Sequence, residues 1–510
     1  MNRTSAQISV LLSLLIVAVV LGLYRPAIQG NYGAADDFPT FFPVDNHIPE
    51  IYRADGRPVL ELLLGIVDGS VDQLKDLGRL RGISVIGIGL LCVTIFYATR
   101  RLLPRDEYRL AVAVAVGGLP TLIVFAAWAT VWSYAWGAML AVLAGMVTWR
   151  GCRLREAGSI FSAVVCWLIS SLLLILIFWT YQPLVSWFWL VALIAVLDGR
   201  FLRNRFYRRE CTWLAATGFV QMGLCFVALK VFILVSGVEP KSRVQLLSDP
   251  LAKAMALGRT TVTMVLDQWQ VVDVDRKPLM LAIAAVSLLI LVAGFVVAWR
   301  SAGQKMRAGV GLRLLWLAAI AFCLAMTHVH GLAADVNVKN YRTIGALCVG
   351  TTILLAWAMS QLCDAFLSAK QSRRAHQALA CGLIVLSLFM ARWNLVHYWT
   401  SPYAVGYQYL VEELEAKFTP STRRIHLVRQ TVDDGIVTQH AIHSFARPLS
   451  EPEWVMPGIL VAALRELPDE PDLSTLTLTH SLSADEAPSG EDVVVIDLRE
   501  LKKFRAGASK

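Results

Sequence analysis

The chain has 510 residues, of which 56% are hydrophobic and 17% are charged, and its formal net charge is +9. Soluble globular domains carry about 25% charged residues, whereas the apolar residues here gather in runs of about 17–25, the length of helix that crosses the ~30 Å hydrocarbon core of a bilayer. This composition excludes an ordinary soluble enzyme and predicts an α-helical polytopic membrane protein. The positive charge helps to predict how the chain is oriented in the membrane, and it favours membrane lipids as partners. We expect no nucleic-acid partner.

Eleven apolar segments follow one another along the chain as predicted transmembrane helices, at residues 8–24, 83–99, 110–127, 132–149, 159–178, 183–197, 211–235, 279–299, 312–327, 343–362 and 377–396. We expect the first to be an uncleaved anchor. Its apolar stretch is longer than the roughly 7–15 residues of a signal peptide, and no small-residue cleavage site follows it.

Basic residues mark every second loop between these segments, and the alternate short loops contain no Lys or Arg. The clusters are Arg100, Arg101, Arg105 and Arg109; Arg150, Arg153 and Arg155; Arg200, Arg203, Arg205, Arg208 and Arg209; Arg300, Lys305, Arg307 and Arg313; and Lys370, Arg373 and Arg374. Because positive charge stays on the cytoplasmic side, we expect the N-terminus inside and the tail outside, on the periplasmic or extracellular face.

This topology places the longer polar segments on the outer face: residues 25–82, 237–278 and 328–342, and the tail. In the second segment Asp249-Pro250 predicts the start of a helix on the membrane surface. Residues 1–398 form the predicted transmembrane catalytic domain. Residues 399–510 form a small extracytoplasmic α/β domain, with helices in "YQYLVEELEAKF" and "EPEWVMPGILVAALREL" and strands in "RRIHLVRQ" and "EDVVVIDLREL".

Two classes of site motif are absent from the sequence. The nine cysteines include no CxxC pair, which argues against zinc and redox sites. No GxxxxGK[ST] occurs, which argues against a nucleotide-driven pump.

The first outer segment carries the densest group of polar residues. Asp36 and Asp37 are adjacent, so their side chains diverge, and one carboxylate can act as a general base while the other caps a turn or binds a metal. Sequence alone does not separate the two. Arg53 and Arg57 are donors suited to phosphate, and Asp55-Gly56 predicts a tight turn that presents Arg57. A solvated loop is the alternative.

Further polar residues extend the candidate site. Lys230 inside the seventh segment, Lys339 and Arg342 are candidate phosphate contacts, with snorkelling or helix-end anchoring as the alternatives. We expect His47, Glu50, Tyr52, His330 and Tyr341 to contact substrate. His328 and His330 lack further ligands at zinc spacing, so we predict no metal site.

The stretch "DDFPTFFPVDNHIPEIYRADGRPVLELLLG" resembles the first loop of bacterial type II O-antigen glucosyltransferases, within the GT-C class of membrane glycosyltransferases. In that family an acidic pair is followed about 20 residues later by an aromatic residue and a GRP-L-like stretch, matched here by Tyr52 and by Gly56-Arg57-Pro58-Val59-Leu60. The motif covers about 35 residues. The family's acidic pair is often followed closely by Arg, where this chain has Phe38-Pro39.

The resemblance implies a bacterial inner-membrane protein that transfers a sugar from a polyprenyl-phosphate donor to a glycan or lipid acceptor, such as lipopolysaccharide in the cell envelope. An Asp would be the general base, with a slight preference for Asp36, and the configuration would invert. A monophosphate leaving group can be balanced by Lys and Arg, so no cofactor is expected; a diphosphate donor would favour a divalent metal. A transporter or flippase of lipid-linked sugars, an O-antigen polymerase or ligase and a structural subunit are the competing hypotheses.

Overall fold

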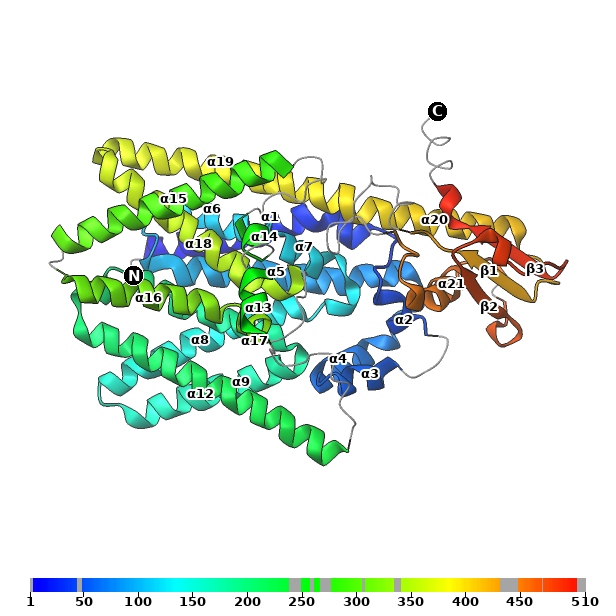
Figure 1. The fold of residues 1–510 in the computed structure, drawn as a ribbon, viewed down its shortest axis with the longest axis horizontal. Coiled ribbons are helices and arrows are strands. Elements are labelled where there is room, and N and C mark those ends of the chain that lie inside the picture. Colours follow the sequence, from blue (N-terminus) through cyan, green and yellow to red (C-terminus); the bar gives the residue numbers. More distant parts are fainter. Residues whose placement is uncertain are drawn as a thin grey trace.

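A computed structural model describes residues 3–43, 48–237, 249–256, 261–266, 277–304, 308–333, 341–431, 448–469 and 471–501 of the chain (Figure 1). The long helices run roughly along the longest axis of the molecule. A small sheet lies at one end, and the N-terminus lies toward the opposite end. The predicted class, a helical polytopic membrane protein with a small C-terminal α/β unit, is confirmed.

Within the described residues, eight helices are long and apolar enough to cross a membrane. They are built on α1 (Arg3–Gln29), α5 (Leu77–Ala98), α8 (Tyr134–Glu156), α9 (Ile160–Thr180), α12 (Arg205–Ser236), α15 (Lys277–Gln304), α18 (Tyr341–Phe366) and α19 (Ala369–Leu395). Each corresponds to one of the predicted apolar segments.

The other three predicted segments are also helical but are not among these eight, so the number of long apolar helices in the described residues is smaller than the predicted eleven. Segment 110–127 is divided into α6 (Asp106–Gly117) and α7 (Pro120–Ala127), which bend by 55° and make a ninth span if counted together. Pro120 lacks a backbone N–H and disfavours helix at the residue before it, so the helix ends and restarts there. Segment 183–197 begins as a 3₁₀ helix, η4 (Gln182–Phe188), before α10 (Trp189–Leu197), and α16 (Val310–Met326) is also short.

Short helices occupy the connections: α2 (Asp37–Phe41), α3 (Ile48–Ala54), α4 (Pro58–Asp68), α11 (Arg200–Arg203), α13 (Pro250–Ala256), α14 (Val262–Leu266) and α17 (Val329–Ala333). Within the described residues, α13 and α14 lie in the segment where the surface helix was predicted. Asp249 caps the first as predicted, because its Oδ1 accepts hydrogen bonds of 3.0 Å from the N–H groups of Leu251 and Ala252.

The C-terminal unit is attached by a continuous helix. α19 passes through one π-helical turn, η7 (Val396–Thr400), into α20 (Ser401–Lys417), so that Ala369–Lys417 forms one 49-residue helix. The predicted domain boundary at residue 398 falls inside it. Beyond it, β1 (Arg424–Val428) pairs in parallel with β2 (Thr477–Ser481) and with β3 (Val493–Asp497), in the order β2-β1-β3. Strand β2 was not predicted, and α21 (Met456–Leu464) is the predicted second helix.

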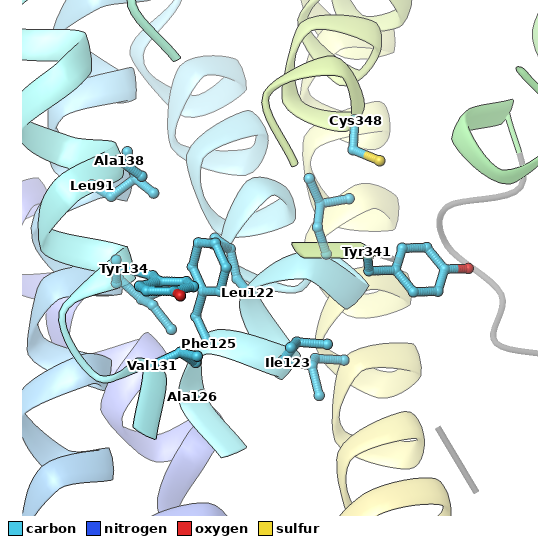
Figure 2. Close-up of a cluster of buried hydrophobic side chains, with 14 of the residues drawn as sticks. Leu91, Leu122, Ile123, Phe125, Ala126, Val131, Tyr134, Ala138, Tyr341 and Cys348 are labelled. Carbon is cyan, nitrogen blue, oxygen red and sulfur yellow. The ribbon is translucent and has the colours of Figure 1, made fainter. Parts of the chain in front are cut away.

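Buried apolar side chains form a core beneath the end of the bundle that carries α2. Figure 2 shows Tyr134 from the start of α8 beside Phe125 of α7, with Leu122 and Leu91 close by. The rings of Phe125 and Tyr134 meet edge to face, with centroids 5.7 Å apart. This packing fixes the direction of Tyr134, whose other ring face contributes to the site described next.

Candidate functional site

The Asp37 carboxylate is fully buried and surrounded by donors. Its Oδ1 accepts hydrogen bonds of 2.7 Å from both the N–H and the hydroxyl of Thr130, and its Oδ2 accepts from the N–H groups of Ala34 (2.9 Å) and Ala129 (3.3 Å). Burial raises the pKa of Asp37, while Arg81 and the hydrogen bonds from Ala34 and Thr130 oppose that rise. These bonds tie the first loop to η3 (Ala129–Val131), the connection between α7 and α8.

Arg81, one turn into α5, holds the same loop from the other side. Its side chain is fully buried, its Nη1 donates to the carbonyls of Ala27 (3.0 Å) and Gly30 (2.9 Å), and its Nη2 donates to the carbonyl of Tyr32. The guanidinium lies 3.8 Å from the centroid of the Tyr32 ring. We call Asp37, Arg81, Tyr32 and Thr130 the clamp, because together they fix residues 27–37 against the bundle.

Asp36 faces a different environment. Its carboxylate is 30% exposed, and its Oδ2 lies 3.6 Å from Nη1 of Arg342, in the first turn of α18. The Arg342 guanidinium also lies over the ring of Trp128, 4.4 Å from the centroid. The two adjacent acids thus differ in access: Asp37 is sealed inside the protein, and Asp36 can meet a ligand.

Arg57 is presented by the predicted turn, which is confirmed. Gly56 has φ +75° and ends α3, with hydrogen bonds of 2.9 Å from its N–H to the Arg53 carbonyl and of 2.8 Å from the Arg57 N–H to the Tyr52 carbonyl. Gln182 donates to the Gly56 carbonyl over 2.9 Å and ties the turn to η4. The Arg57 guanidinium lies 5.0 Å from the centroid of the Tyr181 ring. Its Nε atom is buried and has no hydrogen-bond partner among the described residues.

Three tyrosines connect these groups. The rings of Tyr134 and Tyr181 stack at 4.4 Å with an interplanar angle of 9°. The Tyr134 hydroxyl is within electrostatic range of Arg57, Arg342 and Asp36. The Tyr52 hydroxyl lies 3.0 Å from that of Thr40, and burial, followed by the charge of Asp36, raises the pKa of Tyr52. The candidate site, as used below, comprises Asp36, Tyr52, Arg57, Trp128, Tyr134, Tyr181 and Arg342.

Several predicted residues lie elsewhere. Arg53 is bound by Glu61, with hydrogen bonds of 2.7 and 2.8 Å, and is 47% exposed. Lys230 is exposed beside Phe226, although its neighbour Leu229 lies close to Gly56. Tyr341 is buried, and its carbonyl accepts a hydrogen bond of 2.8 Å from Thr121.

His330 approaches the site only through η4. Its Nδ1 lies 3.1 Å from the Ser186 hydroxyl, one turn along η4 from Gln182. Burial, together with the nearby His328, lowers the pKa of His330 to about 3. Burial, together with the charge of Lys253, lowers the pKa of His328 to about 4. His47, Lys339 and the Glu50 side chain lie outside the described residues. Among the residues that the structure does describe, no group of three or more His, Cys, Asp or Glu could hold a metal ion.

The C-terminal unit covers the short helix that follows Asp36. Gly458 in α21 packs so closely on α2 that a Cβ there would lie 2.7 Å from the carbonyl carbon and 2.8 Å from the oxygen of Phe38. The Phe38 ring stacks on Tyr407 of α20, 6.2 Å between centroids, and Arg465 lies over the Phe42 ring. The sheet unit therefore helps to fix the position of Asp36.

Sequence reasoning missed Trp128, Tyr134, Tyr181 and Arg81. The first three flank the two short loops without Lys or Arg, near residues 129–131 and 180–182, so the predicted topology already places them on the same face as Asp36. Aromatic residues are also common at membrane interfaces. Their presence in these loops therefore did not by itself indicate a role in the site. Arg81 lies two residues before the predicted span 83–99. A charged residue at such a position needs a polar partner, and this was the signal that could have identified it.

Comparisons with known proteins give one structural similarity to report. No protein family matches the sequence, and no curated protein matches it. Among solved structures, an oligosaccharyltransferase of Archaeoglobus fulgidus, in a complex with zinc and sulfate, aligns with a TM-score of 0.43 at 13% identity. The alignment covers 86% of this chain, which spans 62% of the length of that one.

Proposed function

We propose that this protein is a membrane glycosyltransferase that moves a sugar from a polyprenyl-phosphate donor to a hydroxyl of an envelope glycan or lipid, with inversion at the anomeric carbon. One observation carries the proposal. A partly exposed carboxylate, Asp36, and two guanidiniums, Arg57 and Arg342, gather around stacked aromatic rings at the end of the bundle that bears α2.

Each charge has a role in such a transfer. The Asp36 carboxylate takes the proton from the acceptor hydroxyl while the hydroxyl oxygen forms a bond to the anomeric carbon. The bond between that carbon and the donor phosphate oxygen breaks, and the polyprenyl phosphate leaves with the electron pair. Arg57 and Arg342 stabilise the negative charge that develops on the phosphate. The buried Nε of Arg57 supports this role, since a buried donor without a partner calls for an acceptor.

The aromatic residues suit the sugar. Tyr134, Tyr181 and Trp128 offer apolar ring faces beside the charges. Two guanidiniums can balance the negative charge of a leaving monophosphate. This supports a monophosphate donor and transfer without a metal. Chelation of divalent ions by EDTA should then leave the rate unchanged, and loss of activity that Mg²⁺ or Mn²⁺ restores would instead support a diphosphate donor.

The sidedness of the reaction is part of the proposal. The basic clusters favour an N-terminus inside and the candidate site on the outer face of the inner membrane. Cysteines introduced at exposed positions near the site should react with an impermeant thiol reagent added from outside whole cells. Protection there, with labelling only after lysis, would reverse the orientation.

The decisive test is transfer by the purified protein. Asp36→Asn should reduce transfer of radiolabelled sugar from polyprenyl phosphate to extracted envelope glycans by at least about 10³-fold, while the melting temperature stays within a few degrees of wild type. Arg53→Gln, which removes a charge outside the site, is the matched control. Movement of the lipid-linked sugar across vesicles without transfer would favour the flippase, and full transfer by Asp36→Asn would reject Asp36 as the base.

A further inference from the structure

A cavity lies at the opposite end of the bundle from the candidate site. It has a volume of about 470 Å³ and lies among the end of α5, the 3₁₀ turn η2 (Thr99–Arg101), the end of α8 and α10. Four arginines line it: Arg100, Arg101, Arg150 and Arg153. No carboxylate is among the residues that line it.

Two of the four arginines lie near one indole ring. The guanidinium of Arg153 lies 4.2 Å from the centroid of the Trp149 ring and that of Arg101 lies 6.0 Å from it. Arg153 also lies 3.4 Å from Glu210. Because both guanidiniums lie near the Trp149 ring, two positive charges come close together. An anion bound between them would reduce their repulsion.

Glu210 pairs with Arg153 of the cavity, and the other nearby carboxylates pair with arginines outside it. Asp198 is paired with Arg200, while Glu156 lies 3.9 Å from Arg155 and 3.6 Å from Arg209. Arg101 and Arg150 form no ion pair with a carboxylate of the described residues, so an anionic ligand can supply the charge that balances them.

The rest of the lining is apolar. Met146, Val191 and Ile194 form part of the wall, so the cavity offers a charged region beside an oily one. A free inorganic anion would use only the first. A phospholipid would use both, with its phosphate among the guanidiniums and the upper part of an acyl chain along the wall.

We propose that this cavity is a specific binding site for the headgroup of an anionic phospholipid from the membrane leaflet at the arginine-rich end of the protein. The site is separate from the proposed transfer reaction and does not depend on it. Its ligand is held by the phosphate group and by apolar contact together.

The test uses the full-length protein in a neutral detergent. Binding of phosphatidylglycerol is measured by native mass spectrometry, with phosphatidylcholine and inorganic phosphate as comparison ligands. Arg101→Gln combined with Arg150→Gln should weaken phosphatidylglycerol binding roughly tenfold or more, because each basic residue near a phosphate contributes substantially to lipid affinity. Arg150→Gln alone, at an exposed position, should weaken it about threefold and serves if the double variant does not fold.

The matched control is Arg203→Gln combined with Arg205→Gln. Both residues are exposed, lie at the same end and do not line the cavity, so this control removes equal charge and should change binding less than twofold. Equal weakening in both double variants would overturn the proposal in favour of diffuse attraction. Displacement of the lipid by millimolar inorganic phosphate would overturn it in favour of a soluble anion.

Discussion

The clamp and the candidate site are built from neighbouring residues, yet they treat charge in opposite ways. In the clamp, Asp37 is buried among four donor contacts and Arg81 donates to three carbonyls. In the candidate site, the Asp36 carboxylate is 30% exposed and lies 3.6 Å from the guanidinium of Arg342. A carboxylate whose two oxygens both accept hydrogen bonds inside the protein stabilises the fold, whereas an accessible carboxylate can act on a ligand, so the comparison of Asp37 with Asp36 separates scaffold from chemistry within two consecutive residues.

Removing the clamp's acid is expected to have the largest effect. Asp37→Asn places an amide where the backbone presents only donors and leaves Arg81 without the opposing charge in its surroundings. We expect a loss of stability on the order of 3 kcal/mol, measured as a lower melting temperature in detergent. Asp36→Asn, which breaks a partly exposed ion pair with Arg342, should cost less than about 1 kcal/mol. Equal stability of the two variants would remove the distinction between scaffold and site.

Replacing Arg57 should reduce catalysis and spare the fold. Arg57→Gln removes the cation beside Tyr181 and is expected to slow sugar transfer by about 10²-fold with little change in melting temperature. Arg57→Lys should restore part of the rate, since it keeps the charge but loses the fixed geometry. Arg53→Gln, four residues earlier and in a surface ion pair with Glu61, should change the rate less than twofold. An Arg57→Gln enzyme with normal rates would show that the buried guanidinium does not serve the leaving phosphate.

Gly458 tests whether the sheet unit sets the position of Asp36. In Gly458→Ala the new methyl group would collide with the Phe38 backbone, so α2 must shift, and misplacement of a reacting group by about 1 Å lowers rates strongly. Transfer should fall roughly tenfold. Gly406→Ala, where the new Cβ makes ordinary contacts with Leu449 and Leu501, is the control in the same unit. If both variants transfer sugar equally, the contact between α21 and α2 has no part in positioning.

The buried histidines should give the smallest effect, visible as a pH dependence of stability. The unfolded chain has histidine pKa values near 6.5, whereas folding lowers those of His328 and His330 to about 4 and about 3. The unfolded state therefore binds more protons below pH 6.5, and stability, complete above that pH, declines as the pH falls toward 4. The decline is at most about 1.4 kcal/mol per pH unit for each histidine. Melting temperatures from pH 8 to 5 should fall less steeply in His330→Gln, and an unchanged slope would contradict the assignment to His330.

The sequence predicted the helices well because hydrophobic run length is a local property. All eleven apolar segments are helical, and the Asp55-Gly56 turn and the Asp249 cap follow from single residues with strong backbone preferences. The errors came where local signals were ambiguous. The break at Pro120 lies within an uninterrupted apolar run, and β2 begins in "TLTHS", whose alternation is weak.

The candidate site was predicted only in part, because its geometry depends on contacts between distant residues. The density of charge in residues 36–57 drew attention to Asp36 and Arg57, but only the packing of η3 against the first loop distinguishes Asp36 from Asp37. The ion pair between Arg53 and Glu61 likewise forms because the Gly56 turn places α3 against α4, which the sequence alone does not show. Residue type indicated the chemistry, and tertiary structure decided which side chains can perform it.

The uninterrupted 49-residue helix from Ala369 to Lys417 has a practical consequence for anyone wishing to isolate the sheet unit. A recombinant fragment that starts at residue 399 would begin inside a rigid rod, not at a hinge, and would expose Tyr403 and Tyr407 to water once their partners Tyr32 and Phe38 were gone. Such a fragment should aggregate, and a soluble version would need polar replacements on that aromatic face.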